Sequence, residues 1–210
     1  MSKIYLDFDR TLYDTDNFVD EMLDEMASIV CKKYQEVHPN EVIKFVKEKI
    51  SAKQIFGIFS ICEAVGEKYS IDVDRFKECV EKALKNGEKR IYTDAITLLK
   101  ALSQKGYQIN ILTYTTKPDY DYQLKKLEGS RITSLIDNII ITSKEKGSLG
   151  LDYENSIFVD DNPKDLRSLH LSGVKKENLY RIKRKNTKYS DLPITDFEIK
   201  EIGSFDEINI

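Results

Sequence analysis

The sequence predicts an α/β fold, a three-layer core with a parallel central sheet into which an all-helical unit is inserted. Two observations predict it. From about residue 89 onward, short apolar runs of strand length alternate with helical stretches, as in a parallel sheet with helices on both faces. Between the first apolar run and this region, the periodicity is helical throughout. We therefore expect residues 1–15 and 89–210 to form the core domain and residues 16–88 to form a helical domain.

The first core element is the apolar run Ile4-Tyr5-Leu6, which is followed at once by acidic residues and a threonine. This pattern is typical of a buried parallel strand that opens into a loop at its carboxyl end. We expect the strand to end at Asp7.

Helical periodicity predicts four helices in the insertion. Their apolar faces lie, in chain order, within Phe18–Val30, Val42–Ile50, Ile55–Val65 and Asp72–Leu84. Asp16 and Asn40 are placed to cap the first two helices, and Gly87 to close the fourth.

In the rest of the chain, the sequence pattern predicts four more strands and the helices between them. The strand-like runs are residues 107–112, 138–141, 156–159 and 178–182. A helix over 94–104 is stopped by Gly106. From Pro193 onward, apolar and polar residues alternate around Phe197 and Ile199, which indicates an edge strand or a docked tail.

Composition narrows the class of protein. The 210 residues include 33 Lys plus Arg against 36 Asp plus Glu, so we expect no nucleic-acid partner, and the basic cluster at 181–188 is expected to face solvent. No uncharged stretch approaches the roughly 20 residues of a membrane-spanning helix. Three widely spaced cysteines and the lack of a leader pattern predict a cytoplasmic protein. No apolar stripe in the inserted region favours a particular oligomeric state.

Reactive side chains follow the predicted strands at the edge where open α/β sheets bind ligands. They are Asp7, Asp9, Thr11, Thr113, Lys144, Lys146, Asp160 and Asp161. Carboxylates gathered at one rim repel each other unless a cation joins them, and oxygen ligands favour Mg²⁺ over zinc. The sequence therefore predicts a magnesium site.

Asp160 and Asp161 have an alternative interpretation as turn residues before a helix. Asn162, Pro163 and Asp165 form a typical helix start, with an N-cap, a proline at the first helical position and an acid in the first turn. Capping explains these three residues but gives Asp160 and Asp161 no function, which favours a metal site.

The segment Asp7-Phe8-Asp9-Arg10-Thr11 resembles the first motif of the haloacid dehalogenase superfamily, Asp-x-Asp-x-Thr after an apolar strand. The family's other motifs are matched in order by Thr113, by Lys146 with Gly-Ser-Leu after it, and by Asp160-Asp161. The following Gly-Ser-Leu favours Lys146 over Lys144. The resemblance covers residues 3–15 and about 91–182, and it implies a Rossmann-like core with a helical cap. Arg10 stands where the family commonly has glycine.

This resemblance implies a Mg²⁺-dependent phosphatase that acts on a small phosphorylated metabolite. Asp7 would attack phosphorus to form an aspartyl phosphate, while Asp9 would protonate the leaving group and later deprotonate water. Thr113 and Lys146 would bind the phosphoryl group. The carboxylates of Asp7 and Asp161, with Asp160 beside them, and the backbone carbonyl of Asp9 would hold Mg²⁺, which leaves the Asp9 side chain free to carry a proton.

Two further functions stay open at this stage. One is a phosphomutase of the same family, whose activity would depend on a bisphosphate activator. The other is a binding module that keeps the metal and phosphate site without useful turnover. A dehalogenase is disfavoured, because that branch of the family lacks an acid at the position of Asp9.

Overall fold

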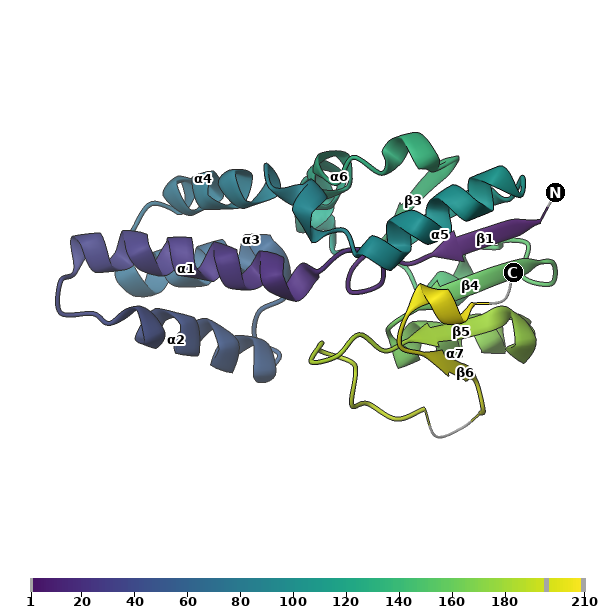
Figure 1. Ribbon diagram of the computed structural model, residues 1–210. Coiled ribbons are helices and arrows are strands. Elements are labelled where there is room, and N and C mark those ends of the chain that lie inside the picture. Colours follow the sequence, from purple (N-terminus) through teal and green to yellow (C-terminus); the bar gives the residue numbers. More distant parts are fainter. Residues whose placement is uncertain (1, 195–196, 209–210) are drawn as a thin grey trace.

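Within residues 2–194 and 197–208, the part of the chain that the structure describes, six parallel strands form one sheet. The computed structural model places them in the order β3-β2-β1-β4-β5-β6 (Figure 1). Their bounds are β1 Lys3–Leu6, β2 Gln108–Tyr114, β3 Asn138–Thr142, β4 Ser156–Asp160, β5 Leu179–Ile182 and β6 Lys200–Ile202. In the central strand β1, Leu6 pairs with Ile111 of β2 and with Val159 of β4. The carboxyl ends of β1, β2 and β4 therefore lie side by side.

Helices cover both faces of this sheet. Helix α5 (Thr93–Gln104) packs in the core cluster that contains Ile4 and Leu6. Helix α7 (Pro163–Leu171) packs in the other cluster, with Tyr5 and Phe158. Since successive side chains of a strand point to opposite faces, the one short run at β1 contributes to both layers. The predicted three-layer α/β core is confirmed.

Four helices are inserted after β1, as predicted, and they lie together beside the sheet (Figure 1). Their bounds are α1 Thr15–Lys33, α2 Pro39–Ser51, α3 Gly57–Tyr69 and α4 Val73–Leu84. Met22, Val46, Val65 and Val80, one from each helix, are buried in one apolar cluster. Packing of these apolar faces against each other stabilises the insertion.

Three predicted helix ends were wrong. The N-cap of α1 is Asp14, whose side chain accepts from the backbone N–H of Asn17, while Asp16 binds Arg10 instead. The N-cap of α2 is His38, because Pro39 occupies the first helical position. Helix α4 ends at Leu84, and Gly87 serves close packing: a Cβ there would lie 2.8 Å from the carbonyl oxygen of Gly129.

Two linkers join the inserted helices to the core, and they are hydrogen-bonded to each other. The N–H of Asp14 donates to the carbonyl of Arg90 at 2.8 Å, and the N–H of Tyr92 donates to the carbonyl of Leu12 at 3.0 Å. The second linker contains the 3₁₀ turn η1 (Gly87–Arg90). The two connections between the inserted helices and the core therefore lie side by side.

The C-terminal segment adds the edge strand β6, as one of the two predicted alternatives. Residues 195–196 of the predicted segment lie outside the described residues. The prediction that the basic cluster at 181–188 faces solvent was wrong for two arginines. Arg181 is buried and donates to the carbonyls of Tyr189 and Leu192, and buried Arg184 donates to Asp94. None of the described helices is long and apolar enough to cross a membrane.

Candidate active site

Three carboxylates meet at the carboxyl ends of β1 and β4. Asp7, Asp160 and Asp161 are buried, and each offers an oxygen within 4.8 Å of the others. The sheet register brings them together, since the N–H of Asp7 donates to the carbonyl of Val159 at 2.9 Å. We refer to Asp7, Asp160 and Asp161 as the carboxylate cluster.

One lysine, Lys146, reaches into the carboxylate cluster. Its ammonium lies 2.7 Å from Asp7 Oδ1 and 2.6 Å from Asp160 Oδ2, and its side chain is 1% exposed. The 3₁₀ turn η4 (Lys146–Ser148) packs tightly on α7, because a Cβ at Gly147 would lie 2.2 Å from the carbonyl oxygen of Ser168. Lys144 is exposed. Of the two lysines considered from sequence, Lys146 is the one that contacts Asp7.

The cluster carries more negative charge than Lys146 balances. Burial raises the pKa of all three carboxyl groups, and the Lys146 ammonium acts in the opposite direction. The charge of Asp7 further raises the pKa of Asp160 and Asp161, and the charge of Asp9 further raises that of Asp7. Oδ2 of Asp161 is buried and has no hydrogen-bond partner among the described residues. An orphaned oxygen beside two further carboxylates is the donor set that a hard divalent cation such as Mg²⁺ prefers. The residues present therefore fit a cation site.

Asp9 lies beside the cluster, and its side chain is held by three residues. Thr15 Oγ1 donates to Asp9 Oδ1 at 2.5 Å, the ammonium of Lys126 contacts the same oxygen, and Gln123 Nε2 donates to Oδ2 at 2.7 Å. Burial raises the pKa of Asp9, but the charge and hydrogen bond of Lys126 and the hydrogen bond of Thr15 outweigh it and lower the pKa to about 2. The sequence analysis expected the Asp9 side chain to be free to carry a proton. In the structure it is instead a carboxylate bound by these three residues.

Thr113 occupies the end of β2 and is fully buried. Its Oγ1 accepts a hydrogen bond of 2.9 Å from Gln123 Nε2. Because β2 pairs with β1 in register, Thr113 stands two residues beyond the partner of Leu6, on the strand next to Asp7. The structure thus brings Thr113 and Asp9 together through a shared neighbour, Gln123.

Gln123 and Lys126 are contacts of Asp9 that the sequence analysis missed, as is Thr15. The first two lie on α6 (Tyr120–Gly129), and both are buried, as is Leu127. The ammonium of Lys126 lies 5.6–5.8 Å from the ring centroids of Phe8, Tyr13 and Phe18. The only sequence signal was their i, i+3 spacing beside a buried leucine, which places them on one helix face.

Arg10 adopts the left-handed region, with φ of 60°. Glycine reaches this region without steric cost, which accounts for its frequent use at the matching position of the family. Here the arginine is anchored, since its Nε donates to Asp16 Oδ1 at 2.9 Å.

The inserted helices contact the core next to the site. Asp119, in the 3₁₀ turn η2 (Lys117–Asp119) after β2, accepts from the N–H of Phe59 in α3 at 2.8 Å. Gly57 makes room for this contact: its φ is 79°, and a Cβ there would lie 1.9 Å from Asp119 Oδ2. A core carboxylate thus binds the N-terminal turn of an inserted helix.

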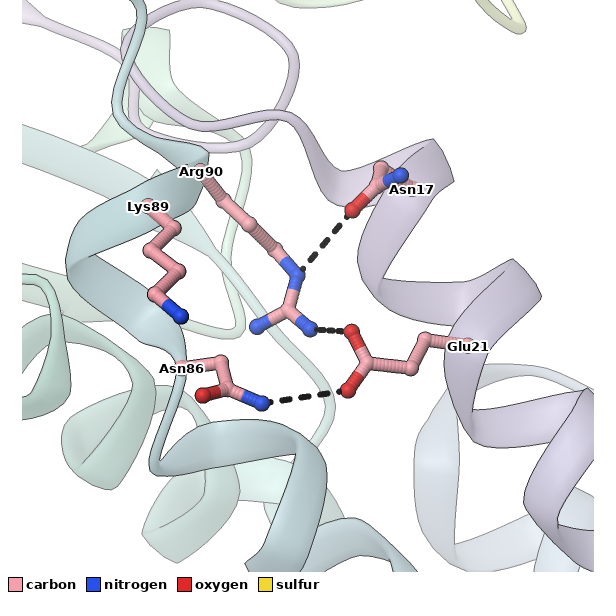
Figure 2. Close-up of a pocket in the computed structure, with 5 residues that line it drawn as sticks. All are labelled: Asn17, Glu21, Asn86, Lys89 and Arg90. Carbon is pink, nitrogen blue, oxygen red and sulfur yellow. Dashed lines mark hydrogen bonds and ion pairs between the residues drawn. The ribbon is translucent and has the colours of Figure 1, made fainter.

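A second polar cluster lies between α1 and η1, where it lines a hollow of about 240 Å³ (Figure 2). Its members are Asn17, Glu21, Asn86, Lys89 and Arg90. Arg90 forms an ion pair with Glu21 and donates to the carbonyl of Ala83 at 2.7 Å. Asn86 donates to the same glutamate at 3.2 Å. We call these five residues the Arg90 cluster.

The strand order, the inserted helices and the acidic site at the carboxyl edge define a Rossmann-like α/β protein. Comparison with protein families then shows the particular family: residues 4–177 match the model of the haloacid dehalogenase-like hydrolases, so the chain belongs to that family. Among curated proteins, none matches this sequence at a significant level.

Solved structures with similar folds include three that cover nearly the whole chain. A haloacid dehalogenase-like hydrolase from Burkholderia xenovorans has a TM-score of 0.70 at 13% identity, covering 98% of this chain and 94% of that one. A HAD phosphatase from Thermococcus onnurineus has a TM-score of 0.68 at 18% identity, covering 99% and 95%. The magnesium-bound HAD-hydrolase YfnB of Bacillus subtilis has a TM-score of 0.67 at 14% identity, covering 98% and 96%. At these identities the likeness shows the fold alone.

Proposed function

We propose that this protein is a Mg²⁺-dependent phosphatase that hydrolyses a small phosphorylated metabolite through an aspartyl-phosphate intermediate. The observation that carries the proposal is the place of Asp7. It stands at the tip of the central strand, buried, in contact with Lys146 and within the carboxylate cluster.

Asp7 is the proposed nucleophile. Attack by its carboxylate on phosphorus, with departure of the alcohol, divides one difficult displacement into two easier ones. Burial raises the pKa of Asp7, and the charge and hydrogen bond of Lys146 oppose this and favour the ionised form that attack requires. Water then attacks the phosphorus of the aspartyl phosphate and releases inorganic phosphate.

Asp9 is the proposed general acid and base. In the first step it gives a proton to the departing oxygen, and in the second it takes a proton from the attacking water. The observed contacts with Lys126 and Thr15 favour the carboxylate, which is the form that accepts a proton in the second step. The first step needs a proton on Asp9 when the substrate is bound.

Thr113 and Lys146 are the proposed ligands of the phosphoryl group. The hydroxyl of Thr113 accepts from Gln123, which leaves its proton for a phosphoryl oxygen. The Lys146 ammonium balances charge on the transferring group, and both interactions are stronger in a buried site than in water.

A bound Mg²⁺ would neutralise charge on the phosphoryl group and hold it against Asp7. The proposed ligands are the carboxylates of Asp7 and Asp161, with Asp160 beside them, and the backbone carbonyl of Asp9. Support comes from the orphaned Oδ2 of Asp161 and from the excess negative charge of the cluster.

Residues 16–88 are proposed to act as a cap domain over the core formed by residues 1–15 and 89–210. The contact between Asp119 and the N-terminal turn of α3 holds the inserted helices against the core beside β2. A lid in this position excludes water and bulky substrates, which favours a small metabolite over a phosphorylated macromolecule.

The proposal is tested by assaying the purified protein with 4-nitrophenyl phosphate in Mg²⁺ and then in excess EDTA. We expect release of inorganic phosphate in Mg²⁺ and its loss in EDTA. Absence of phosphate release in Mg²⁺, from this substrate and from a panel of phosphorylated metabolites, would support the binding-module alternative. Turnover of sugar phosphates that requires a bisphosphate activator would support the phosphomutase.

A further inference from the structure

We propose that Gln123 is a positioning residue for the phosphatase reaction, which it serves by holding the Asp9 carboxylate and the Thr113 hydroxyl in one fixed arrangement. The inference rests on the proposed function. Gln123 comes from α6, outside the four sequence motifs, and is 5% exposed.

The side-chain amide of Gln123 uses both of its donors on the site. Nε2 donates to Asp9 Oδ2 at 2.7 Å and to Thr113 Oγ1 at 2.9 Å. The orientation of the amide follows from chemistry, because a carboxylate accepts hydrogen bonds and cannot donate them. One NH₂ group therefore links the proposed acid and base to the proposed phosphoryl ligand.

The hydrogen bonds from Gln123 set the orientation of the Thr113 hydroxyl and of the Asp9 carboxylate. Since Thr113 accepts from Gln123, the threonine proton is directed elsewhere and is available to a phosphoryl oxygen. Asp9 is fixed on its other oxygen by Thr15 and Lys126, so Oδ2 depends on Gln123. Removing the amide leaves that oxygen without its donor while the remaining contacts stay in place.

A rigid link of this kind matters for proton transfer, which needs donor and acceptor at hydrogen-bond distance. Misplacement of a catalytic group by about 1 Å can cost about 10²-fold in rate. Leu127 of α6 is buried in the main core cluster, so the helix that carries Gln123 is held by packing. The position of Gln123 is therefore set by the packing of α6.

The test compares two substrates of nearly equal size, 4-nitrophenyl phosphate and phenyl phosphate, in the variants Gln123→Met and Gln123→Glu. Both variants keep the length of the side chain. Gln123→Met removes the donor to Asp9, and Gln123→Glu replaces the amide NH₂ with an oxygen that donates only when it is protonated. Phenolate is the poorer leaving group, so its departure depends more on a proton from Asp9. The parameter is kcat/KM, which reports the step in which the leaving group departs.

We expect kcat/KM to fall for both substrates and to fall about tenfold more for phenyl phosphate, since a well-placed acid contributes about 10²–10⁴-fold. The ratio between substrates, measured on one preparation, does not depend on the fraction of folded enzyme. Gln104→Met, an exposed glutamine at the end of α5, is the matched control and should leave the ratio unchanged.

Equal losses for the two substrates, or no loss, would overturn the positioning role while leaving the phosphatase intact. A wild-type protein without turnover of either substrate would instead overturn the proposed function. The double variant Gln123→Met with Asp9→Asn separates the remaining case: if Gln123 acts through Asp9, the glutamine substitution no longer changes the substrate ratio in the Asp9→Asn background.

Discussion

The carboxylate cluster and the Arg90 cluster are two polar groups set into the same chain, and they differ in charge balance. In the Arg90 cluster, the guanidinium is matched by Glu21 and also contacts the amide oxygen of Asn17 (Figure 2). It donates as well to the carbonyl of Ala83. In the carboxylate cluster, Lys146 faces Asp7 and Asp160, and Asp161 keeps an unpaired oxygen. The first cluster is complete without a ligand, whereas the second is not.

The difference in charge balance is what distinguishes a structural cluster from the proposed functional one. A buried charge is costly unless it is paired and hydrogen-bonded, so a chain that keeps an excess of buried carboxylates sacrifices stability for another purpose. The Arg90 cluster holds the second linker against α1, and its hollow is a consequence of that arrangement. The carboxylate cluster is the one that we propose to bind a cation and a substrate. Three substitutions sharpen this comparison.

The largest effect is expected from Mg²⁺ itself. A cation bound to the folded protein at 100 times its Kd stabilises it by about 2.7 kcal/mol. Asp161→Asn should lose this gain, and in EDTA it should be at least as stable as the wild type, because one of three mutually repelling carboxylates is gone. Urea unfolding in Mg²⁺ and in EDTA measures both effects. Glu21→Gln, in the Arg90 cluster, is the control that keeps the gain, and an equal gain in Asp161→Asn would contradict the cation site.

A somewhat smaller effect is expected for Arg90→Met. Hydrogen bonds to a charged group contribute about 1.5–3 kcal/mol each, but Glu21 is partly exposed and regains water, so we expect a loss of about 2 kcal/mol. The loss should be the same in Mg²⁺ and in EDTA, as measured by urea unfolding. Lys89→Met, at the exposed rim, should change nothing. A loss that appears only in Mg²⁺ would show that the two clusters are coupled.

The smallest effect concerns pH and a third ion pair, Asp94 with Arg184. Burial raises the pKa of Asp94, but the hydrogen bonds from Arg184, Ser204 and the N–H of Phe205 outweigh it and lower that pKa. The pair therefore adds stability above the ordinary aspartate pKa, and this stability is lost as pH falls through the lowered pKa. Asp94→Asn should cost about 1 kcal/mol at pH 7 and progressively less below about pH 4. An equal cost at pH 7 and pH 3 in urea unfolding would exclude an electrostatic origin.

Much of the fold could be predicted from the sequence because strands and helices differ in period. The side chains of Ile4, Tyr5 and Leu6 pack on both faces of the sheet, as expected for a buried parallel strand. The insertion, in contrast, shows helical periodicity alone. The carboxylate cluster could be predicted for a related reason. Acidic residues directly after two strands must meet when those strands are parallel neighbours, as β1 and β4 are.

Contacts made by the middle of a helix could not be predicted in the same way. Gln123 and Lys126 reach Asp9 only because α6 packs at a particular angle and rotation, which depends on tertiary contacts far from those residues. The prediction that the basic cluster faces solvent was wrong for a similar reason. A run of charges does not reveal that Arg181 is buried against backbone carbonyls. The sequence pattern therefore predicts which residues lie at strand ends better than it predicts which neighbour a helix face contacts.

The assignment of Asp7 as nucleophile is tested most directly by the turnover of Asp7→Asn with 4-nitrophenyl phosphate at saturating Mg²⁺, compared with the wild type and with the exposed control Asp152→Asn. The account predicts that kcat falls by at least about 10³-fold in Asp7→Asn, since loss of a nucleophile can cost about 10⁶-fold, while Asp152→Asn keeps wild-type turnover. Turnover of Asp7→Asn within about tenfold of the wild type would contradict the account, since a misplacement alone can cost more than that.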